Sequence, residues 1–401
     1  MPTLATGRTA GSSTAAPFRI AVADRRYFAI SLYNTNTPAL LWRTLMPALR
    51  PFATATIILV GIVVFWISAA SAADWDSLKQ NYVNQQYGVF LHYNMSTYCG
   101  MEWAFSYSTA DAAKTFNPTG FIDTDQWATA AKNAGMTYGV LTAKHTDGFC
   151  LWDTSVSEYD VAVCPWFNDP ANVNYKRDIV KAYADSFRKA GLNVGIYYSI
   201  WDKRNGIGPR YYKRDVLDPQ LTSAAATEYV KTQLKELLTN YGKINVIWFD
   251  GWGMNLDKRS GVHWDGYKTT GSKGGKFVAV DYAEIRDYVR SLAPEILIVN
   301  NSGKGNPSLT DIMPYEQTLP PDGDNPPNEA CDVIRADKRW FWHPDGADSF
   351  RTAKEIGERK IHVNDCNGTY LLDVPPDRGG VIPATEAAFL QKVKEYLDGV
   401  R

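Results

Sequence analysis

The sequence predicts an α/β fold in which strands and helices alternate to close a (β/α)8-type, TIM-like barrel. Strand and helix patterns follow one another over about 330 residues, which is enough chain for one such barrel. The strand segments are continuous hydrophobic runs, which is typical of parallel strands buried on both faces. A doubly wound open sheet is the alternative, but no G-x-G-x-x-G follows the first strand and no G-x-x-x-x-G-K-[ST] occurs anywhere.

The clearest strand covers residues 244–249, a mostly β-branched and aromatic run that ends on Asp250 and Gly251. The other expected strands cover residues 87–94, 138–145, 193–200, 296–300, 312–316 and 369–374. Expected helices cover residues 76–86, 124–134, 178–190, 225–240, 282–292, 352–359 and 386–397. Gly135 and Gly191 directly follow two of these helices, as glycine commonly does at a helix C-terminus.

The N-terminal region predicts export from the cytoplasm. Residues 52–70 are nearly all apolar and uncharged, Arg50 precedes them, and the A-x-A sequence of residues 70–72 follows. We interpret residues 46–72 as a signal peptide that starts at Met46, with a retained membrane anchor as the alternative. Residues 1–45 are then a disordered or mis-annotated extension, and residues 73–401 a single catalytic domain without a C-terminal β-sandwich. The expected location is secreted, periplasmic or otherwise extracytoplasmic.

Composition narrows the choice of partners. A net charge of −1 over 401 residues gives no electrostatic reason to expect nucleic acid. The 13 Trp, 23 Tyr and 16 Phe suit either an aromatic core or a carbohydrate site, in which rings pack on sugar faces. The five cysteines form no C-x-x-C pair, which argues against a structural zinc site, and their odd number leaves at least one thiol unpaired.

Polar side chains stand at the end of strand after strand. In a barrel these ends meet on the face where the chemistry lies. Two carboxylates on that face can divide the work of glycoside hydrolysis, one as nucleophile and the other as acid and then base. Asp250 and Glu316 are the candidates. The complete set of strand-end groups is His92, Lys144, His145, Tyr197, Trp248, Asp250, Asn300, Asn301 and Glu316.

Two other kinds of catalysis fit less well. Metal-dependent barrel hydrolases usually carry His-x-His on the first strand, whereas this chain has His92-Tyr93-Asn94 and five histidines in all. A serine hydrolase would need a G-x-S-x-G elbow, which is absent. The sequence therefore predicts no catalytic metal and no cofactor.

From about residue 74 to the C-terminus, the chain resembles the α-L-fucosidases of glycoside hydrolase family 29. The most specific motif is Lys-His-x-Asp-Gly-Phe-x-Leu-Trp at residues 144–152. Further motifs match in order at residues 87–92, 102–103, 134–138, 195–199, 248–251 and 371–379. The resemblance implies a retaining exo-α-L-fucosidase that acts on a fucosylated oligosaccharide or glycoconjugate and needs no cofactor.

The resemblance also implies roles for individual residues. Asp250 aligns with the nucleophile of the family. The segment 311–317 resembles the family's Asp-x-x-Thr-Pro-Glu and points to Glu316 as the acid/base, with Glu295 and Glu329 as alternatives. The residues that align with the fucose-binding groups are His92, Glu102, Trp103, His145, Tyr197 and Trp248.

Three departures from the family pattern leave other functions open. Thr146 stands where a second histidine is common, Asn301 where an arginine is common, and Pro314-Tyr315 where Thr-Pro is usual. An enzyme for a related sugar such as α-L-galactose, and a catalytically silent carbohydrate-binding protein, are the alternatives. Oligomeric state, linkage preference and disulfide pairing are not predicted.

Overall fold

The computed structural model describes residues 73–208, 221–251, 254–255, 278–303, 306, 308–323, 325–345 and 349–400. The predicted N-terminal extension of residues 1–45 and the signal or anchor segment of residues 46–72 lie outside the described residues. Within the described residues, no helix is both long and apolar enough to cross a lipid bilayer. All five cysteines are described, and each carries a free thiol.

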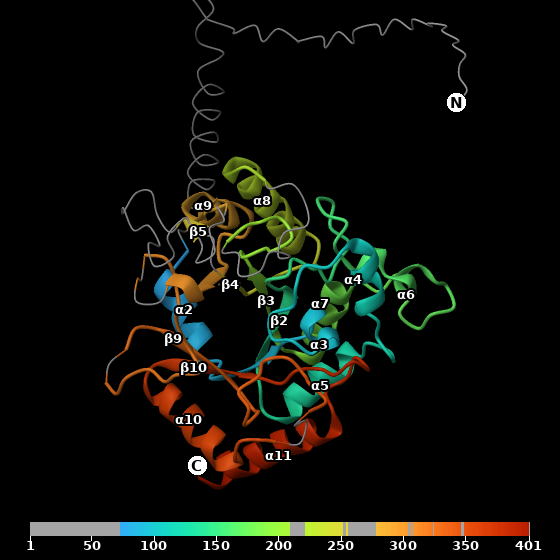
Figure 1. Cartoon of the computed structure of the whole chain (residues 1–401). Helices are drawn as coiled ribbons and strands as arrows, with labels where there is room; N and C mark the ends of the chain where they lie inside the picture. The colour runs from blue at the N-terminus through green and yellow to red at the C-terminus, as the bar shows by residue number, and fades with distance from the viewer. Residues whose placement is uncertain are drawn as a thin grey trace, which may run out of the picture. The chain divides into compact units, whose positions relative to one another are not determined.

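Eight parallel strands form the centre of the fold (Figure 1). They follow the order β7-β4-β3-β2-β1-β10-β9-β8, and the parallel bridge between Val299 and Ile312 joins the two edges into a nearly closed barrel. The (β/α)8-type, TIM-like fold class is therefore confirmed. The barrel strands are β1 (Tyr87–Leu91), β2 (Tyr138–Lys144), β3 (Asn193–Ser199), β4 (Val246–Asp250), β7 (Leu297–Asn300), β8 (Met313–Glu316), β9 (Asn328–Val333) and β10 (Gly368–Asp373). A separate two-stranded pairing joins β5 (Met254–Asn255) to β6 (Val280–Asp281).

Helices surround the strands, with α8 and α9 packed together on one side of the view and α10 and α11 on the other (Figure 1). Most of the longer helices begin after an Asp or Thr whose side chain accepts a hydrogen bond from the first turn, as Asp178 does from the Lys181 N–H at the start of α7. The helices are α2 (Trp75–Val83), α3 (Met95–Cys99), α4 (Thr109–Thr115), α5 (Thr124–Asn133), α6 (Pro165–Asn168), α7 (Ile179–Ala190), α8 (Ser223–Thr239), α9 (Tyr282–Leu292), α10 (Ala353–Asp365) and α11 (Ala384–Gly399), with 3-10 turns η1 (Val161–Val163) and η2 (Asn301–Gly303).

Several elements differ from the expectation: α3, α4, α6, β5 and β6 were not expected, and two further differences have a clear physical reason. Helix α10 continues to Asp365 instead of ending at Arg359, because Ile356, Lys360 and Val363 bury one face at helical spacing. Strand β9 was not expected at all, since its segment Asn-Glu-Ala-Cys-Asp-Val reads as polar. The barrel accommodates its two carboxylates by hydrogen-bonding each of them.

The strands separate two hydrophobic layers. Side chains alternate along each strand, so Phe90, Tyr197 and Trp248 point into the barrel while their neighbours pack against the helices. Helix α2 lies at the N-terminal end of the strands, where Tyr82 joins the interior cluster. The barrel is thus filled with side chains, and polar residues at the C-terminal ends of the strands stand above this packed interior.

Candidate active site

The two predicted catalytic carboxylates share a hydrogen-bond donor. Asp250 is the last residue of β4 and Glu316 the last residue of β8. Between them lies Asn301, the first residue of the turn η2 after β7, whose Nδ2 donates to Asp250 Oδ1 at 3.1 Å and to Glu316 Oε2 at 2.8 Å. These carboxylate oxygens therefore lie no more than 5.9 Å apart. Three separate strand ends thus bring two acids to one place.

Asp250 receives a second fixed donor from β3. The register of the sheet sets Tyr197 beside Trp248 and Ser199 beside Asp250. The Tyr197 hydroxyl reaches Asp250 Oδ2 at 2.8 Å, and the tyrosine itself is only 2 % exposed. Both oxygens of Asp250 therefore accept a hydrogen bond, while the residue keeps an intermediate exposure. A carboxylate held in this way is oriented and still accessible.

His92 and His145 line the same region of the barrel and are both buried. His92 Nδ1 lies 2.7 Å from Asp373 Oδ1 at the end of β10, and the His145 ring stacks on Tyr197 with centroids 5.9 Å apart. Burial lowers the pKa of His92 well below its usual value, and the charge of His145 adds to this effect. Burial, followed by the charge of Lys203, lowers the pKa of His145 to about 3. Both rings are therefore neutral near pH 7, and each offers one donor and one acceptor nitrogen.

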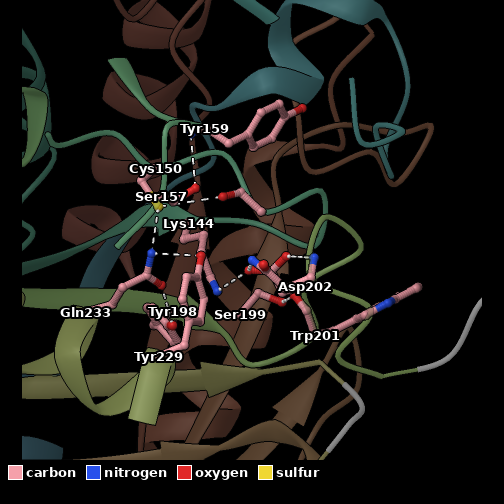
Figure 2. A network of polar contacts seen from close by, with 12 residues as sticks. Lys144, Cys150, Ser157, Tyr159, Tyr198, Ser199, Trp201, Asp202, Tyr229 and Gln233 are labelled. Atoms are coloured by element: carbon pink, nitrogen blue, oxygen red, sulfur yellow. Dashed lines mark hydrogen bonds and ion pairs between the residues drawn. The ribbon is translucent and has the colours of Figure 1, made fainter. Parts of the chain in front are cut away.

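An irregularity in β2 decides which way His145 faces. The register between β2 and β3 shifts between Thr142 and Lys144, as it does at a β-bulge. Lys144 consequently turns outward, where its Nζ lies 3.0 Å from Asp202 Oδ2 and 4.3 Å from the centre of the Tyr198 ring (Figure 2). The next residue, His145, then points toward the centre of the barrel.

Two predicted sugar-binding residues come from the segment after α3. The Glu102 carboxylate accepts hydrogen bonds from the backbone N–H groups of Trp340 at 2.8 Å and Phe341 at 3.4 Å, and burial raises its pKa. Trp103 is 65 % exposed, and Lys203 Nζ lies 3.4 Å from its carbonyl oxygen. Glu102 thus fixes the loop after β9 beside the site, and Trp103 presents a large apolar ring to solvent.

Trp248 lies beside Tyr197 in the packed interior of the barrel. It is 2 % exposed, its ring stacks on Tyr197 at 5.5 Å, and its indole N–H donates to Glu329 Oε1 at 2.7 Å. Glu329 therefore supports the floor of the site. The other alternative acid, Glu295, has a 63 % exposed side chain that lies 3.6 Å from Lys243. Of the three glutamates considered for the acid/base, Glu316 is the one that shares a donor with Asp250.

Sequence reasoning missed several groups that shape the site. It listed Asn301 among the strand-end groups and as a departure from the family pattern but did not predict its bridge between the two acids, and it assigned no role to Asp373, Trp340 or Phe341. The Trp340 ring packs on His92 with centroids 4.9 Å apart, and the Phe341 ring packs on His145 at the same distance. The signals for Asp373 were its position near the end of an expected strand and its place in the family motif of residues 371–379. Trp340 and Phe341 belong to a loop whose path the sequence does not indicate.

Comparison with known proteins gives a consistent result. Residues 60–400 match the family model described as Alpha-L-fucosidase. Alpha-L-fucosidase 1 of Arabidopsis thaliana is 27 % identical over 319 residues, which cover 78 % of this chain and 58 % of the plant protein. Among solved structures, alpha-L-fucosidase isoenzyme 1 from Paenibacillus thiaminolyticus is 30 % identical, with a TM-score of 0.61 and coverage of 80 % of this chain and 75 % of that one.

A second solved structure has a chain of more similar length. Alpha-L-fucosidase AlfC from Lactobacillus casei, in complex with its α-L-fucose product, is 25 % identical with a TM-score of 0.62. The match covers 80 % of this chain and 98 % of AlfC. By contrast, the chain spans little more than half the length of the plant relatives that it matches.

Proposed function

The chain belongs to the alpha-L-fucosidase family, and we propose that it is an exo-acting, retaining α-L-fucosidase that removes terminal α-L-fucose from fucosylated oligosaccharides or glycoconjugates. The observation that carries the proposal is the Asn301 bridge between Asp250 and Glu316. Retaining glycosidases keep their two carboxyl groups about 5–5.5 Å apart, whereas inverting enzymes keep them about 6.5–9.5 Å apart. An upper limit of 5.9 Å between the bridged oxygens favours the retaining geometry.

Each carboxylate has a defined part in this mechanism. An Asp250 oxygen attacks C1 of the fucose while Glu316 transfers its proton to the departing glycosidic oxygen, so that a covalent fucosyl-enzyme forms. Glu316, now ionised, takes a proton from water as the water attacks C1, and the Asp250 carboxylate departs. Two inversions restore the original configuration. No step uses a metal or a cofactor.

Tyr197 and Asn301 serve both steps of the reaction. Their hydrogen bonds hold the Asp250 carboxylate in one orientation for attack. The same donors stabilise the negative charge when Asp250 leaves in the second step. Asn301 also limits how far Glu316 can move away from the nucleophile.

The sugar is held by the remaining predicted residues. The neutral rings of His92 and His145 can each exchange hydrogen bonds with sugar hydroxyls, and among the described residues His145 Nδ1 has no hydrogen-bond partner. The stacked rings of Tyr197 and Trp248 form the floor of the site. Glu102 holds the loop that carries Trp340. Trp103 is exposed to solvent, where it can pack on the group attached to fucose.

Azide can test the role of each carboxylate on an aryl α-L-fucoside. In Asp250→Ala, azide replaces the missing nucleophile and should give the β-fucosyl azide. In Glu316→Ala, azide attacks the fucosyl-enzyme from the opposite face and should give the α-fucosyl azide. The same azide configuration from both variants, or turnover close to wild type in Asp250→Ala, would remove these assignments.

Two further assays address the alternatives. An aryl α-L-galactoside measured in parallel should be a poorer substrate than the fucoside, and the reverse order would favour the related sugar. Calorimetry with fucose tests the silent-binding alternative, because binding without any product release from the aryl fucoside would favour a carbohydrate-binding protein.

We further propose that the enzyme acts outside the cytoplasm, with residues 46–72 as its signal segment. The charge-free apolar run and the A-x-A sequence support this proposal. N-terminal sequencing of protein from the exporting host should give a chain that starts at Ala73. Recovery of membrane-bound protein that retains residues 46–72 would favour an anchor, and intact protein in the cytoplasm would contradict export.

A further inference from the structure

The loop after β3 carries three charged residues in succession, Asp202, Lys203 and Arg204, and all three contact other segments of the chain. Asp202 forms a buried ion pair with Lys144 on β2, in which Oδ2 and Nζ lie 3.0 Å apart (Figure 2). Backbone hydrogen bonds of 2.9 Å run in both directions between Asp202 and Ile207 and close the loop. The loop is therefore tied both to the barrel and to itself.

The other two charges reach the segment that follows α3. Lys203 Nζ donates to the backbone carbonyl oxygen of Ala104 at 2.8 Å and to that of Trp103 at 3.4 Å. Arg204 Nη1 donates to the carbonyl oxygen of Tyr107 at 2.7 Å. The loop after β3 thus holds the segment that carries Trp103 against the barrel.

The burial of Lys203 makes its contacts hard to give up. The residue is 2 % exposed, so its ammonium group needs partners within the protein. An ammonium has three N–H donors and no acceptor, and the two consecutive carbonyl groups of residues 103 and 104 accept from it. The backbone N–H of Lys203 donates to the carbonyl oxygen of Thr146 at 2.9 Å, one residue after His145. Lys203 therefore fixes the path of residues 103–104 relative to the strand end that carries His145.

The indole ring of Trp103 depends on this support. Because the residue is 65 % exposed, packing cannot hold its ring, and the position of the ring follows from the backbone. Ser96 on α3 supports the backbone from a second direction, since its Oγ accepts from the Ala104 N–H at 3.2 Å and donates to the Glu102 carbonyl oxygen at 3.1 Å. Lys203 and Ser96 together give the exposed ring a fixed point of attachment.

We propose that Lys203 is a positioning residue that holds Trp103 where it packs on the sugar attached to fucose, so that the enzyme favours substrates in which fucose is linked to a second sugar ring. This inference rests on the proposed fucosidase function. The exposed indole offers an apolar face, and a sugar ring presents C–H groups that can pack on such a face. The contribution of Lys203 should therefore appear in the binding of the second sugar and not in the cleavage of the bond.

Two substrates separate this role from catalysis. α-L-Fucosyl fluoride carries no second sugar, whereas a disaccharide with terminal α-L-fucose does. Lys203→Met removes the charge and keeps the length of the side chain. It should raise KM for the disaccharide about 10-fold, which is the contribution of a well-placed aromatic contact, and leave kcat/KM for the fluoride within about 3-fold of wild type. Trp103→Ala should reproduce both results, and an equal loss on the two substrates in either variant would overturn the proposal.

A double-mutant cycle tests whether the two residues act together. In the Trp103→Ala background, Lys203→Met should raise KM for the disaccharide by less than about 2-fold, because the ring that it positions is gone. Effects of the two substitutions that multiply as independent effects do would contradict the proposal.

A matched control and a second variant keep the test decisive. Lys360→Met changes a buried lysine on α10 and should leave KM for both substrates unchanged, and a rise like that in Lys203→Met would also count against the proposal. Trp103→Ala changes an exposed side chain and should fold, so its two-substrate comparison decides the matter if Lys203→Met does not fold. Wild-type protein that releases no fluoride from fucosyl fluoride would contradict the proposed function itself, which distinguishes that failure from the loss of this inference.

Discussion

Two carboxylates stand inside one barrel, one at each end, and their surroundings are opposite. Glu329 is 1 % exposed near the N-terminal end of β9 and accepts hydrogen bonds from the Tyr82 and Tyr138 hydroxyls, at 2.5 and 2.8 Å, and from the Trp248 indole. Asp250, at the C-terminal end of β4, has two donors and stays partly exposed beside a second acid. The first is a satisfied structural group, and the second is suited to react.

The contrast shows that hydrogen bonding alone does not mark a reactive acid. Among the described residues Glu329 has more donors than Asp250, yet it is enclosed by α2 and the strands, and no second carboxylate of that part of the chain shares a donor with it. Asp250 has an accessible face and a neighbour that can hold a proton for the leaving group. Accessibility together with a second acid therefore distinguishes the candidate catalytic end of the barrel from its structural end.

The largest effect is expected from Asp250→Asn. Without the attacking oxygen, kcat/KM for an aryl α-L-fucoside should fall by about 10³-fold or more. The free energy of unfolding should stay within about 1 kcal/mol of wild type, because the residue is partly exposed and the amide keeps the shape of the side chain. Steady-state kinetics and urea unfolding measure the two quantities. A destabilised but active variant would assign Asp250 to the structural class.

Glu329→Gln should show the opposite pattern. The amide nitrogen would face a hydroxyl or indole donor, which leaves a buried polar group unpaired and should cost about 3 kcal/mol of stability. Activity per folded molecule should remain of the same order as wild type. A loss of activity without a change in the urea midpoint would give Glu329 a role in catalysis and remove the contrast.

Asn301→Ala tests whether the bridge positions the two acids. Loss of hydrogen bonds to charged groups, each about 1.5–3 kcal/mol, should lower kcat about 10–100-fold. The affinity for free fucose should change little, because the bridge contacts the carboxylates and not the predicted sugar-binding histidines. Asn301→Gln, which keeps an amide donor, should recover part of the rate. A rise in KM at unchanged kcat would instead assign Asn301 to substrate binding.

The smallest expected effect is a pH-dependent change in stability caused by Asp147. This third carboxylate is buried near the C-terminal end of β2. Burial raises its pKa to about 7, partly opposed by the charge of Lys203. Between pH 3.8 and about 7 the unfolded chain loses this proton while the folded chain retains it, so ionisation destabilises the fold as the pH rises.

Asp147→Asn removes this cost, so above pH 7 the free energy of unfolding of the variant should exceed that of wild type by roughly 1 kcal/mol. This gain is smaller than the full pKa shift of Asp147 implies, because local relaxation of the protein lowers the energy of a buried charge. The gain should disappear below pH 3.8, the value at which the unfolded carboxyl also holds its proton. Urea unfolding across this pH range measures the difference. A difference that does not change with pH would mean that Asp147 does not titrate in this window.

The sequence predicted the parts of this molecule whose side chains follow a simple pattern. The strands that run as apolar segments, and helices such as α9, lie close to where hydrophobicity places them. Strand β9 escaped prediction because Glu329 and Asp332 interrupt it, and their partners come from distant segments. Asp332, for instance, pairs with Arg351 and Arg359 on the α10 side.

The candidate site shows the same division. Asp250 and Glu316 were predicted because strand ends converge in a barrel, which is a property of topology. The bridge by Asn301 was not predicted, because it depends on a turn directing one side chain between two others. The loop that carries Trp340 and Phe341 is fixed by Glu102, 238 residues away in the chain, and no local pattern records such a contact.

The shifted register within β2 has a consequence for how this chain can vary. It sets which of two adjacent side chains, a lysine and a histidine, faces the candidate active site and which faces α8. If the strand instead kept strict alternation from Thr142 onward, a permanent cation would face the candidate active site and the imidazole would lie among Tyr198 and Tyr229. The register shift therefore serves the candidate active site and the buried Lys144–Asp202 ion pair together, so straightening this strand end would disturb both while every functional group stays in the chain.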